Sequence, residues 1–360
     1  MSNPGGIYIL PAAIMHGRQA AHALRNSLAG PLAGADDIAF AVAEVSRRCP
    51  NTGEISRQWL SWPGLLRAAE KDPALGERLD RVISPRPPAE RLDFSRPLVM
   101  GIVNVTPDSF SDGGLHDDAQ GAIAHGRRLA AEGADILDIG GESTRPGAAP
   151  VTVEEEIRRT IPVVRALAAE GFIVSIDTRK AAVMEAAAQA GAAIINDVSA
   201  LSFDPGAPAA AAASGLPVVL MHALDTPERM QDDPRYEDAP RDIFDAMEER
   251  LEAAVSAGVR RGNIIIDPGI GFGKTLEHNL ELMEQLALFH GLGQPLLLGA
   301  SRKRFIGGIT GVERPDQRLA GSLAAAQGAV MAGAHIVRVH DVAETVRMIK
   351  MTKAMKFAAW

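Results

Sequence analysis

From Leu98 onward the chain repeats one pattern eight times, and this repeat constrains the fold more than any other feature. Each repeat has a short apolar run, then a polar or glycine-rich loop, then an alanine-rich amphipathic segment. Such runs are typical of strands buried on both faces, and the amphipathic segments are typical of helices. The eight runs are residues 98–105, 136–139, 173–176, 193–198, 217–221, 264–266, 296–298 and 335–339.

Helices are expected between these runs, at 119–132, 153–170, 181–190, 241–257, 276–289 and 317–332, with a last one after Asp341. Glycines follow most of them at the position of a helix C-cap. Eight strand–helix units in series predict an α/β fold of the (β/α)8 TIM-barrel class. A doubly wound sheet is the alternative, but it usually carries a glycine-rich dinucleotide fingerprint after its first strand, which this sequence lacks.

Residues 1–90 do not follow the repeat. Strands are expected at 7–10 and 38–45, a helix at 16–28, and one or two helices at 57–82, the last carrying Trp59 and Trp62. The proline-rich stretch 84–88 is stiff and marks a boundary. We therefore predict a small N-terminal α/β region of unknown role at 1–90, followed by the barrel at 91–360.

Composition excludes several classes of protein. The net charge is −8 and no basic stripe is present, which argues against nucleic-acid binding. No apolar run approaches the length of about 18 residues that suggests a membrane span. The single cysteine, Cys49, excludes an intrachain disulfide and fits a reducing cytoplasm.

Polar residues follow all eight apolar runs, where the active site of a barrel lies. Taken singly, each could be a helix cap or a turn residue. A core built only for stability would not collect them at one rim, because a buried polar group costs free energy unless it is paired. The eight ends carry Asn104 with Thr106 and Asp112, Glu142 to Arg145, Asp177, Asn196, Met221 with His222, Asp267 with Phe272 and Lys274, Ser301 to Lys303, and Arg338 with His340.

The residue types indicate the chemistry of a ligand. Asp177, Asp267 and Asn196 offer acceptors and donors suited to a flat, nitrogen-rich heterocycle. Arg338 and His340 are two apart on a strand and point the same way, and Asn104 lies on the neighbouring strand. Arginine suits a phosphate group. We expect this anion site to be separate from the carboxylates, and hence one ligand with a flat head and a phosphate tail.

The sequence offers little for a resident cofactor. Gly271 to Thr275 has the tail of a nucleotide-binding loop, but the first glycine of that motif is missing. No His/Cys cluster has the spacing of a zinc site. Any metal is expected to be Mg²⁺, shared between oxygen ligands and substrate phosphates.

Several of these strand ends closely resemble the motifs of the dihydropteroate synthase family, and the resemblance covers residues 98–357. The matching segments are 104–114 (NVTPDSFSDGG), 141–147 (GESTRPG), 195–197 (IND), 267–269 (DPG), 301–303 (SRK) and 338–341 (RVHD). The family, a target of sulfonamides, makes 7,8-dihydropteroate in folate biosynthesis. It condenses 6-hydroxymethyl-7,8-dihydropterin pyrophosphate with p-aminobenzoate by a dissociative substitution that releases pyrophosphate.

The resemblance implies a role for each matching residue, Mg²⁺ at Asn104, and a homodimer. Asp112, Asp177 and Lys303 are implied to be catalytic. The pterin would be held by Asp177, Asn196, Met221, Asp267 and Lys303. The pyrophosphate would be held by Asn104, Arg338 and His340. The p-aminobenzoate site would be formed by Thr144, Arg145, Pro146, Phe272 and Ser301.

Two other functions stay open at this point. A pterin-binding methyltransferase, which moves methyl groups between tetrahydrofolate and a corrinoid protein, would share the carboxylates but would not need Ser301 to Lys303 or the Arg338/His340 pair. A catalytically silent paralogue would bind pterin or a partner. The chain also departs from the family after Met221-His222, and its N-terminal extension is absent from the compact family pattern.

Overall fold

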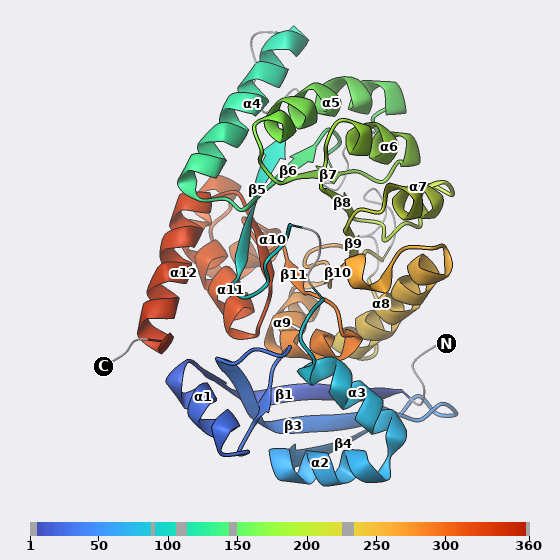
Figure 1. Cartoon of the computed structure of the whole chain (residues 1–360), viewed down its shortest axis with the longest axis vertical. Coiled ribbons are helices and arrows are strands. Elements are labelled where there is room, and N and C mark those ends of the chain that lie inside the picture. Colours follow the sequence, from blue (N-terminus) through green and yellow to red (C-terminus); the bar gives the residue numbers. More distant parts are fainter. Residues whose placement is uncertain (1–5, 88–90, 106–113, 144–149, 225–233, 358–360) are drawn as a thin grey trace.

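The computed structural model describes residues 6–87, 91–105, 114–143, 150–224 and 234–357. Two parts are visible in Figure 1: a barrel of strands ringed by helices, and a small antiparallel sheet with three helices beside it. The first part is formed by the repeat that starts at Leu98, and the second by the N-terminal extension.

Eight parallel strands form the barrel in the described part of the chain. From β5 to β10, strands that follow one another in sequence are neighbours, while β12 pairs with β5 and β11 pairs with β12. A bridge between Ile266 and Leu296 joins the last two edges, so the (β/α)8 barrel prediction is confirmed. The strands are β5 (Leu98–Asn104), β6 (Ile136–Gly140), β7 (Val174–Asp177), β8 (Ile194–Asp197), β9 (Val218–Met221), β10 (Ile264–Asp267), β11 (Leu297–Leu298) and β12 (Ile336–Val339).

Helices cover the outside of the barrel, and local capping fixes where several of them begin. The Thr152 hydroxyl accepts from the Glu155 N–H at 3.3 Å, and Thr275 forms a capping box with His278. Two short helices, α7 and α10, lie between apolar runs, at residues where the sequence analysis named no helix. The helical elements are α4 (Gly114–Glu132), α5 (Val153–Ala169), α6 (Ala181–Gln189), α7 (Ala207–Ser214), α8 (Ala239–Ser256), η2 (Arg261–Asn263), α9 (Leu276–Glu284), η3 (Leu286–Leu292), α10 (Arg304–Thr310), η4 (Pro315–Gln317), α11 (Leu319–Met331) and α12 (Val342–Phe357).

The period-2 alternation of the strands separates two apolar layers. Val99, Leu137 and Val337 belong to the large cluster between strands and helices, whereas Leu98 and Ile136 belong to a second cluster inside the barrel. Leu92 joins that inner cluster from the segment before β5. Continuing the alternation toward the strand ends brings polar residues to the inside, and the site therefore lies above an apolar floor.

The N-terminal extension has its own sheet and core. Strand β3 pairs antiparallel with β1 on one side and with β2 and β4 on the other. An inner cluster that includes Phe40, Trp62 and Leu65 joins the sheet to its helices, which confirms the small α/β region. Its elements are β1 (Ile7–His16), α1 (Arg18–Arg25), β2 (Gly30–Pro31), β3 (Ile38–Arg48), β4 (Ile55–Ser61), α2 (Trp62–Lys71) and α3 (Pro73–Ile83).

The predicted helical start at residue 57 is wrong. Residues Ile55–Ser61 form β4, in which Trp59 pairs with Glu44 of β3 and is 58% exposed. Trp62 is buried within the extension and meets Phe40 edge to face, with ring centroids 5.6 Å apart. Pairing with the long strand β3 overrides a local pattern that periodicity alone does not resolve.

The extension lies beside one end of the barrel (Figure 1). Its strand β1 and helix α3 contact η3, and its strands β1 and β3 contact α8. Tyr8 enters the outer core cluster of the barrel and meets Phe244 of α8 edge to face, with centroids 5.5 Å apart. Arg78 of α3 donates to the Gly291 carbonyl at 2.8 Å and forms an ion pair with Glu248 at 2.9 Å. That residues 1–90 and 91–360 are separate folding domains stays a prediction.

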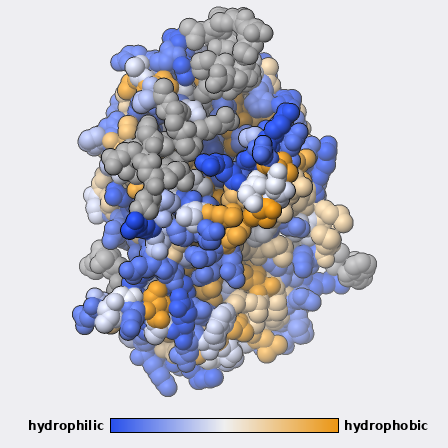
Figure 2. All heavy atoms as spheres, turned by 180° about the vertical axis from the view of Figure 1, so that it is seen from behind, coloured by the Kyte–Doolittle hydropathy of each residue, from blue (hydrophilic) through white to orange (hydrophobic). Residues whose placement is uncertain are grey.

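The face of the molecule that is hidden in Figure 1 is largely hydrophilic and carries smaller hydrophobic patches (Figure 2). Among the described residues, no helix is both long enough and apolar enough to cross a membrane.

Candidate active site

A cluster of charged side chains fills the barrel at the carboxyl ends of its strands. Arg338 of β12 donates from Nε to Asp138 Oδ2 at 2.6 Å and from Nη2 to Asp177 Oδ2 at 2.7 Å. The expectation that Arg338 lies apart from the carboxylates is therefore wrong. The arginine side chain is long enough to extend across the barrel interior from β12 to β6 and β7. Spacing along the sequence does not show this reach.

Asp138 of β6 was missed by sequence reasoning. It is fully buried, and its Oδ2 also accepts from Asn196 Nδ2 at 3.1 Å. Its other oxygen, Oδ1, has no hydrogen-bond partner among the described residues. A usable signal was present, because a carboxylate inside the apolar run 136–139 is costly to bury without partners.

Burial changes the protonation of this cluster. Desolvation raises the pKa of Asp177 to about 7, with the Arg338 charge opposing the rise and Asp138 adding to it. Desolvation also raises the pKa of Asp267, against the attraction of Lys303. The Lys303 pKa falls to about 8, because burial outweighs the effect of Asp267. Perturbed pKa values that gather at one rim mark a candidate functional site.

Lys303 joins the carboxylate cluster to the loop after β10. Its Nζ donates to the Ile270 carbonyl and lies 4.4 Å from the centre of the Phe272 ring. The predicted pterin ligands Asn196 and Asp267 are buried nearby on β8 and β10, and Met221 is the buried last residue of β9. These residues lie together at the carboxyl ends of their strands, and their roles as pterin ligands stay a prediction.

Two further predicted ligands lie at the seam between β12, β5 and β6. A Cβ built on Gly140 would lie 3.7 Å from Asp177 Oδ2 and 3.9 Å from Asn104 Oδ1, so Asn104 lies close to the carboxylates. His340 donates its backbone N–H to Ser301 Oγ at 3.2 Å, and its Nδ1 lies 3.1 Å from the same oxygen. Ser301 and His340, predicted for different substrates, are thus direct neighbours.

The loops after β9 and β10 are packed together at the backbone. Gly269 has a φ of +71°, and a Cβ there would overlap the His222 carbonyl oxygen. Lys274 is buried and donates to the Phe272 carbonyl at 2.9 Å and to the His222 carbonyl at 3.3 Å. Desolvation lowers the pKa of Lys274, and the neighbouring Lys303 lowers it further. Lys274 therefore holds two loops together instead of serving as a phosphate-loop lysine.

The loop after β6 is fixed by a second charged network that the sequence did not predict. Glu142 forms ion pairs with Arg179 at 3.0 Å and Lys180 at 3.1 Å, and Lys180 also pairs with Glu156 at 2.5 Å. The remaining predicted residues, Thr106, Asp112, Thr144, Arg145 and Pro146, lie outside the described residues.

Comparison with known proteins identifies the family. The family model described as "Pterin binding enzyme" matches residues 100–340. Dihydropteroate synthase of Escherichia coli strain K12 is 50% identical over 264 residues, which is 73% of this chain and 93% of that protein.

Two solved structures from Xanthomonas albilineans are also similar. Its dihydropteroate synthase with 4-aminobenzoic acid has a TM-score of 0.72 and 50% identity, covering 76% of this chain and 100% of that chain. The complex with 7,8-dihydropteroate has a TM-score of 0.68 and 49% identity, covering 74% and 97%. The chain therefore belongs to the pterin-binding enzyme family, among the dihydropteroate synthases.

Proposed function

We propose that the protein condenses 6-hydroxymethyl-7,8-dihydropterin pyrophosphate with p-aminobenzoate to give 7,8-dihydropteroate and pyrophosphate. The observation that carries this proposal is the buried cluster at the rim of the barrel, with the Asp177 pKa raised to about 7 and the Lys303 pKa lowered to about 8. The family provides the reaction, and the similar Xanthomonas albilineans enzyme has been solved with 4-aminobenzoic acid and with 7,8-dihydropteroate.

The pterin would lie over the apolar floor of the barrel, against Asp177, Asn196, Asp267 and Lys303, with Met221 beside it. Ionised carboxylates accept from the amino group and ring N–H of a pterin, and the amide both donates and accepts. Because these groups are buried, each hydrogen bond to the ring acts in a medium of low dielectric constant and selects strongly for a matching edge. Asp138 would act through Arg338 and Asn196, which it holds in place.

Departure of pyrophosphate would be assisted by Arg338, His340 and Asn104. Burial alone would lower the pKa of Arg338, but Asp138 and Asp177 raise it above its usual value, so the guanidinium stays charged. A positive group placed where the leaving group gains charge stabilises the transition state. The nearby carboxylates would in turn stabilise the positive charge left on the pterin methylene group in a dissociative substitution.

The donor set is compatible with Mg²⁺ held mainly by the substrate. Among the described residues, no group of three or more His, Cys, Asp or Glu side chains could hold a metal ion. Mg²⁺ often takes only one or two protein oxygens and otherwise binds phosphates and water. The Asn104 carboxamide oxygen would be the protein ligand, and the ion would supply positive charge to the pyrophosphate when bound.

The amine would attack from the side of the loops after β6, β10 and β11. Phe272 and Ser301 would form its wall, with Thr144, Arg145 and Pro146 from the loop after β6. Asp112, from the loop after β5, would lie over the reacting groups.

Purified protein, both substrates and Mg²⁺ test this function directly, by following release of pyrophosphate and formation of dihydropteroate. Product that depends on both substrates is the expected result. A folded protein that binds the pterin without turnover would instead indicate a silent paralogue. Methyl transfer from methyltetrahydrofolate to a corrinoid would indicate the methyltransferase.

A homodimer in the cytoplasm is also proposed. Large apolar side chains of α9, α10 and α12 are exposed on this single chain, namely Leu280, Ile309, Met351 and Met355. Association of two chains would bury apolar groups of this kind. Light scattering after size-exclusion chromatography would measure the mass in solution, and a monomer at micromolar concentration would refute the dimer. The single cysteine agrees with a reducing compartment, and cell fractionation tests that location.

A further inference from the structure

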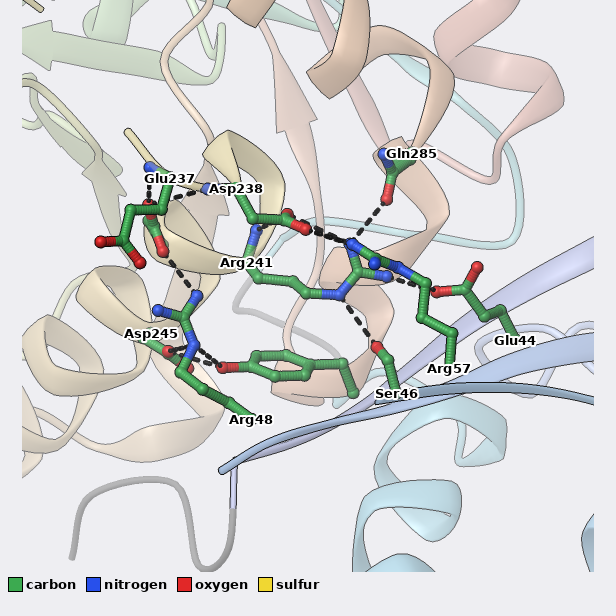
Figure 3. A network of polar contacts seen from close by, with 11 residues as sticks. Glu44, Ser46, Arg48, Arg57, Glu237, Asp238, Arg241, Asp245 and Gln285 are labelled. Carbon is green, nitrogen blue, oxygen red and sulfur yellow. Dashed lines mark hydrogen bonds and ion pairs between the residues drawn. The ribbon is translucent and has the colours of Figure 1, made fainter. Parts of the chain in front are cut away.

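The N-terminal extension is fastened to the start of α8, where the chain leaves the rim of the barrel. Figure 3 shows side chains of β3 and β4 meeting those of residues 237–245. Arg57 of β4 donates to Asp238 Oδ2 at 2.7 Å, and Arg48 of β3 donates to Asp242 Oδ1 at 2.5 Å. Arg241 of α8 donates to Glu44 Oε1 of β3 at 2.5 Å.

These contacts hold the backbone that leads into α8, not only its side chains. Asp238 is the N-cap of the helix and accepts from the Arg241 N–H at 3.2 Å. The second oxygen of Asp242 accepts from the N–H groups of Glu237 and Asp238, at 2.9 and 3.2 Å. In each of these two carboxylates, one oxygen thus accepts from an arginine of the extension and the other accepts from backbone N–H groups of residues 237–241.

Tyr236, the residue just before this segment, contacts the loop that carries Phe272, a proposed p-aminobenzoate ligand. The Tyr236 hydroxyl donates to the Gly273 carbonyl at 2.9 Å, next to Phe272. Its ring also meets His278 edge to face, with centroids 5.0 Å apart, and lies 6.1 Å from His222. Lys274 donates hydrogen bonds to the carbonyls of Phe272 and His222 and so ties the same loop to the end of β9.

We propose that the extension positions the amine side of the active site, with Arg48 and Asp242 acting through Tyr236 on the loop that carries Phe272. This inference rests on the proposed function. It assigns a role to a part of the chain that precedes the matched residues 100–340. The pterin side depends less on this route, because Asp177, Asn196 and Asp267 lie on strands held by the hydrogen bonds of the barrel itself. Of the proposed pterin ligands, Lys303 contacts the loop that carries Phe272.

Two variants break the route at different points, and one neighbouring variant is a matched control. Arg48→Gln removes the ion pairs to Asp242 and Asp245 and the hydrogen bond to the Tyr8 hydroxyl. Tyr236→Phe removes only the hydroxyl that reaches Gly273. Arg47→Gln changes the next residue of the same strand, whose ion pair with Asp72 stays inside the extension. All three are made in the full-length chain, and steady-state rates are measured with each substrate varied in turn.

Loss of one such hydrogen bond is expected to raise the KM for p-aminobenzoate about fivefold in Arg48→Gln and Tyr236→Phe. The KM for the pterin pyrophosphate should stay within about twofold, since Asp177, Asn196 and Asp267 lie on barrel strands away from the route. Arg47→Gln should behave as the wild type, and Arg48→Lys should recover part of the loss. Equal rises in both KM values, or the same change in Arg47→Gln, would overturn the proposal.

Hydrogen exchange gives a readout that does not need turnover. The peptide containing Gly269 to Thr275 should lose protection in Arg48→Gln and keep it in Arg47→Gln. Unchanged protection in Arg48→Gln would refute the coupling even if the enzyme is active. Tyr236→Phe decides the matter if Arg48→Gln does not fold. An inactive wild-type protein would refute the proposed function, and exchange would still test the route.

Discussion

Two clusters of buried charge in this molecule look alike but are built differently. The rim cluster consists of Asp138, Asp177, Asp267, Lys303 and Arg338, and the joint cluster consists of Glu44, Ser46, Asp238, Arg241 and Gln285. In the joint cluster every nitrogen of the Arg241 guanidinium has an acceptor: Nε bonds Ser46, Nη1 bonds Asp238 and Gln285, and Nη2 bonds Glu44.

The rim cluster, in contrast, has a hydrogen-bond acceptor that no described residue fills. Asp138 Oδ1 is buried without a partner among the described residues, and burial raises the pKa of both Asp177 and Asp267. Incomplete pairing costs stability, and such a cost is expected where a ligand supplies the missing partners. In this molecule the saturated cluster joins the extension to the barrel, whereas the unsaturated one lies at the proposed binding site.

Removing a rim carboxylate should therefore harm activity and spare the fold. Asp177→Asn is expected to lower kcat/KM for the pterin substrate about 10³-fold, or about 4 kcal/mol, because a buried charged acceptor is lost. The folded pKa of Asp177 is raised, so its ionisation makes folding less favourable as the pH rises from about 4 to 7. The melting temperature at pH 8 should therefore be unchanged or higher. A variant that unfolds as readily as it loses activity would break the distinction between the clusters.

The joint cluster should give the opposite result. Arg241→Met leaves Glu44 and Asp238 with only the half-exposed Arg57 as a charged partner, and this is expected to cost about 3 kcal/mol of unfolding free energy. Urea unfolding followed by circular dichroism measures the loss. The control is Arg127→Met, which removes an exposed ion pair with Glu170 and should cost far less, because solvent screens such a pair. Equal losses in the two variants would mean that the joint is no stronger than a surface contact.

The fold was predictable because it depends on a short-range pattern that recurs. Each apolar run predicted from residues 98–339 overlaps one strand of the barrel, and the glycines mark the helix ends. In the extension, residues 57–61 were misassigned because β4 (Ile55–Ser61) is defined by its pairing with the preceding strand β3 and not by its own residue pattern. Periodicity reports such pairing only weakly in a single exposed strand.

The membership of the site was predictable except for Asp138, whereas its geometry was not. Asp177, Asn196, Asp267 and Lys303 could be selected because they follow apolar runs. The reach of Arg338 across the barrel to Asp138 and Asp177 depends on strand order and side-chain length, and the sequence shows neither. Tyr236 and Lys274 act through backbone carbonyls, for which no residue pattern exists.

Arg338 lies between the rim carboxylates, so its removal tests how much it contributes to binding the anion and how much to binding the pterin. Arg338→Ala is expected to weaken binding of the pterin pyrophosphate about 50-fold and of a bare pterin about fivefold, because charge-assisted bonds to the anion are the stronger ones. Calorimetry with both ligands gives the two losses. Their difference measures the share of Arg338 in holding the anion, and equal losses would place Arg338 with the pterin alone.

The smallest expected effect is on the pH dependence of kcat/KM, which distinguishes the charge of Asp177 from that of Lys303. Asp177 must be ionised to accept from the pterin, so kcat/KM should fall below its pKa of about 7. Lys303 must be protonated to donate, so kcat/KM should also fall above its pKa of about 8, by about tenfold for each further pH unit. The expected result is a narrow bell between these values. Lys303→Arg should keep the acid limb and move the alkaline limb upward by more than one unit, because an arginine stays charged throughout this range. A wild-type profile that is flat from pH 6 to 9 would show that neither charge is needed in the form proposed, and the rim cluster would then be no more than a second joint.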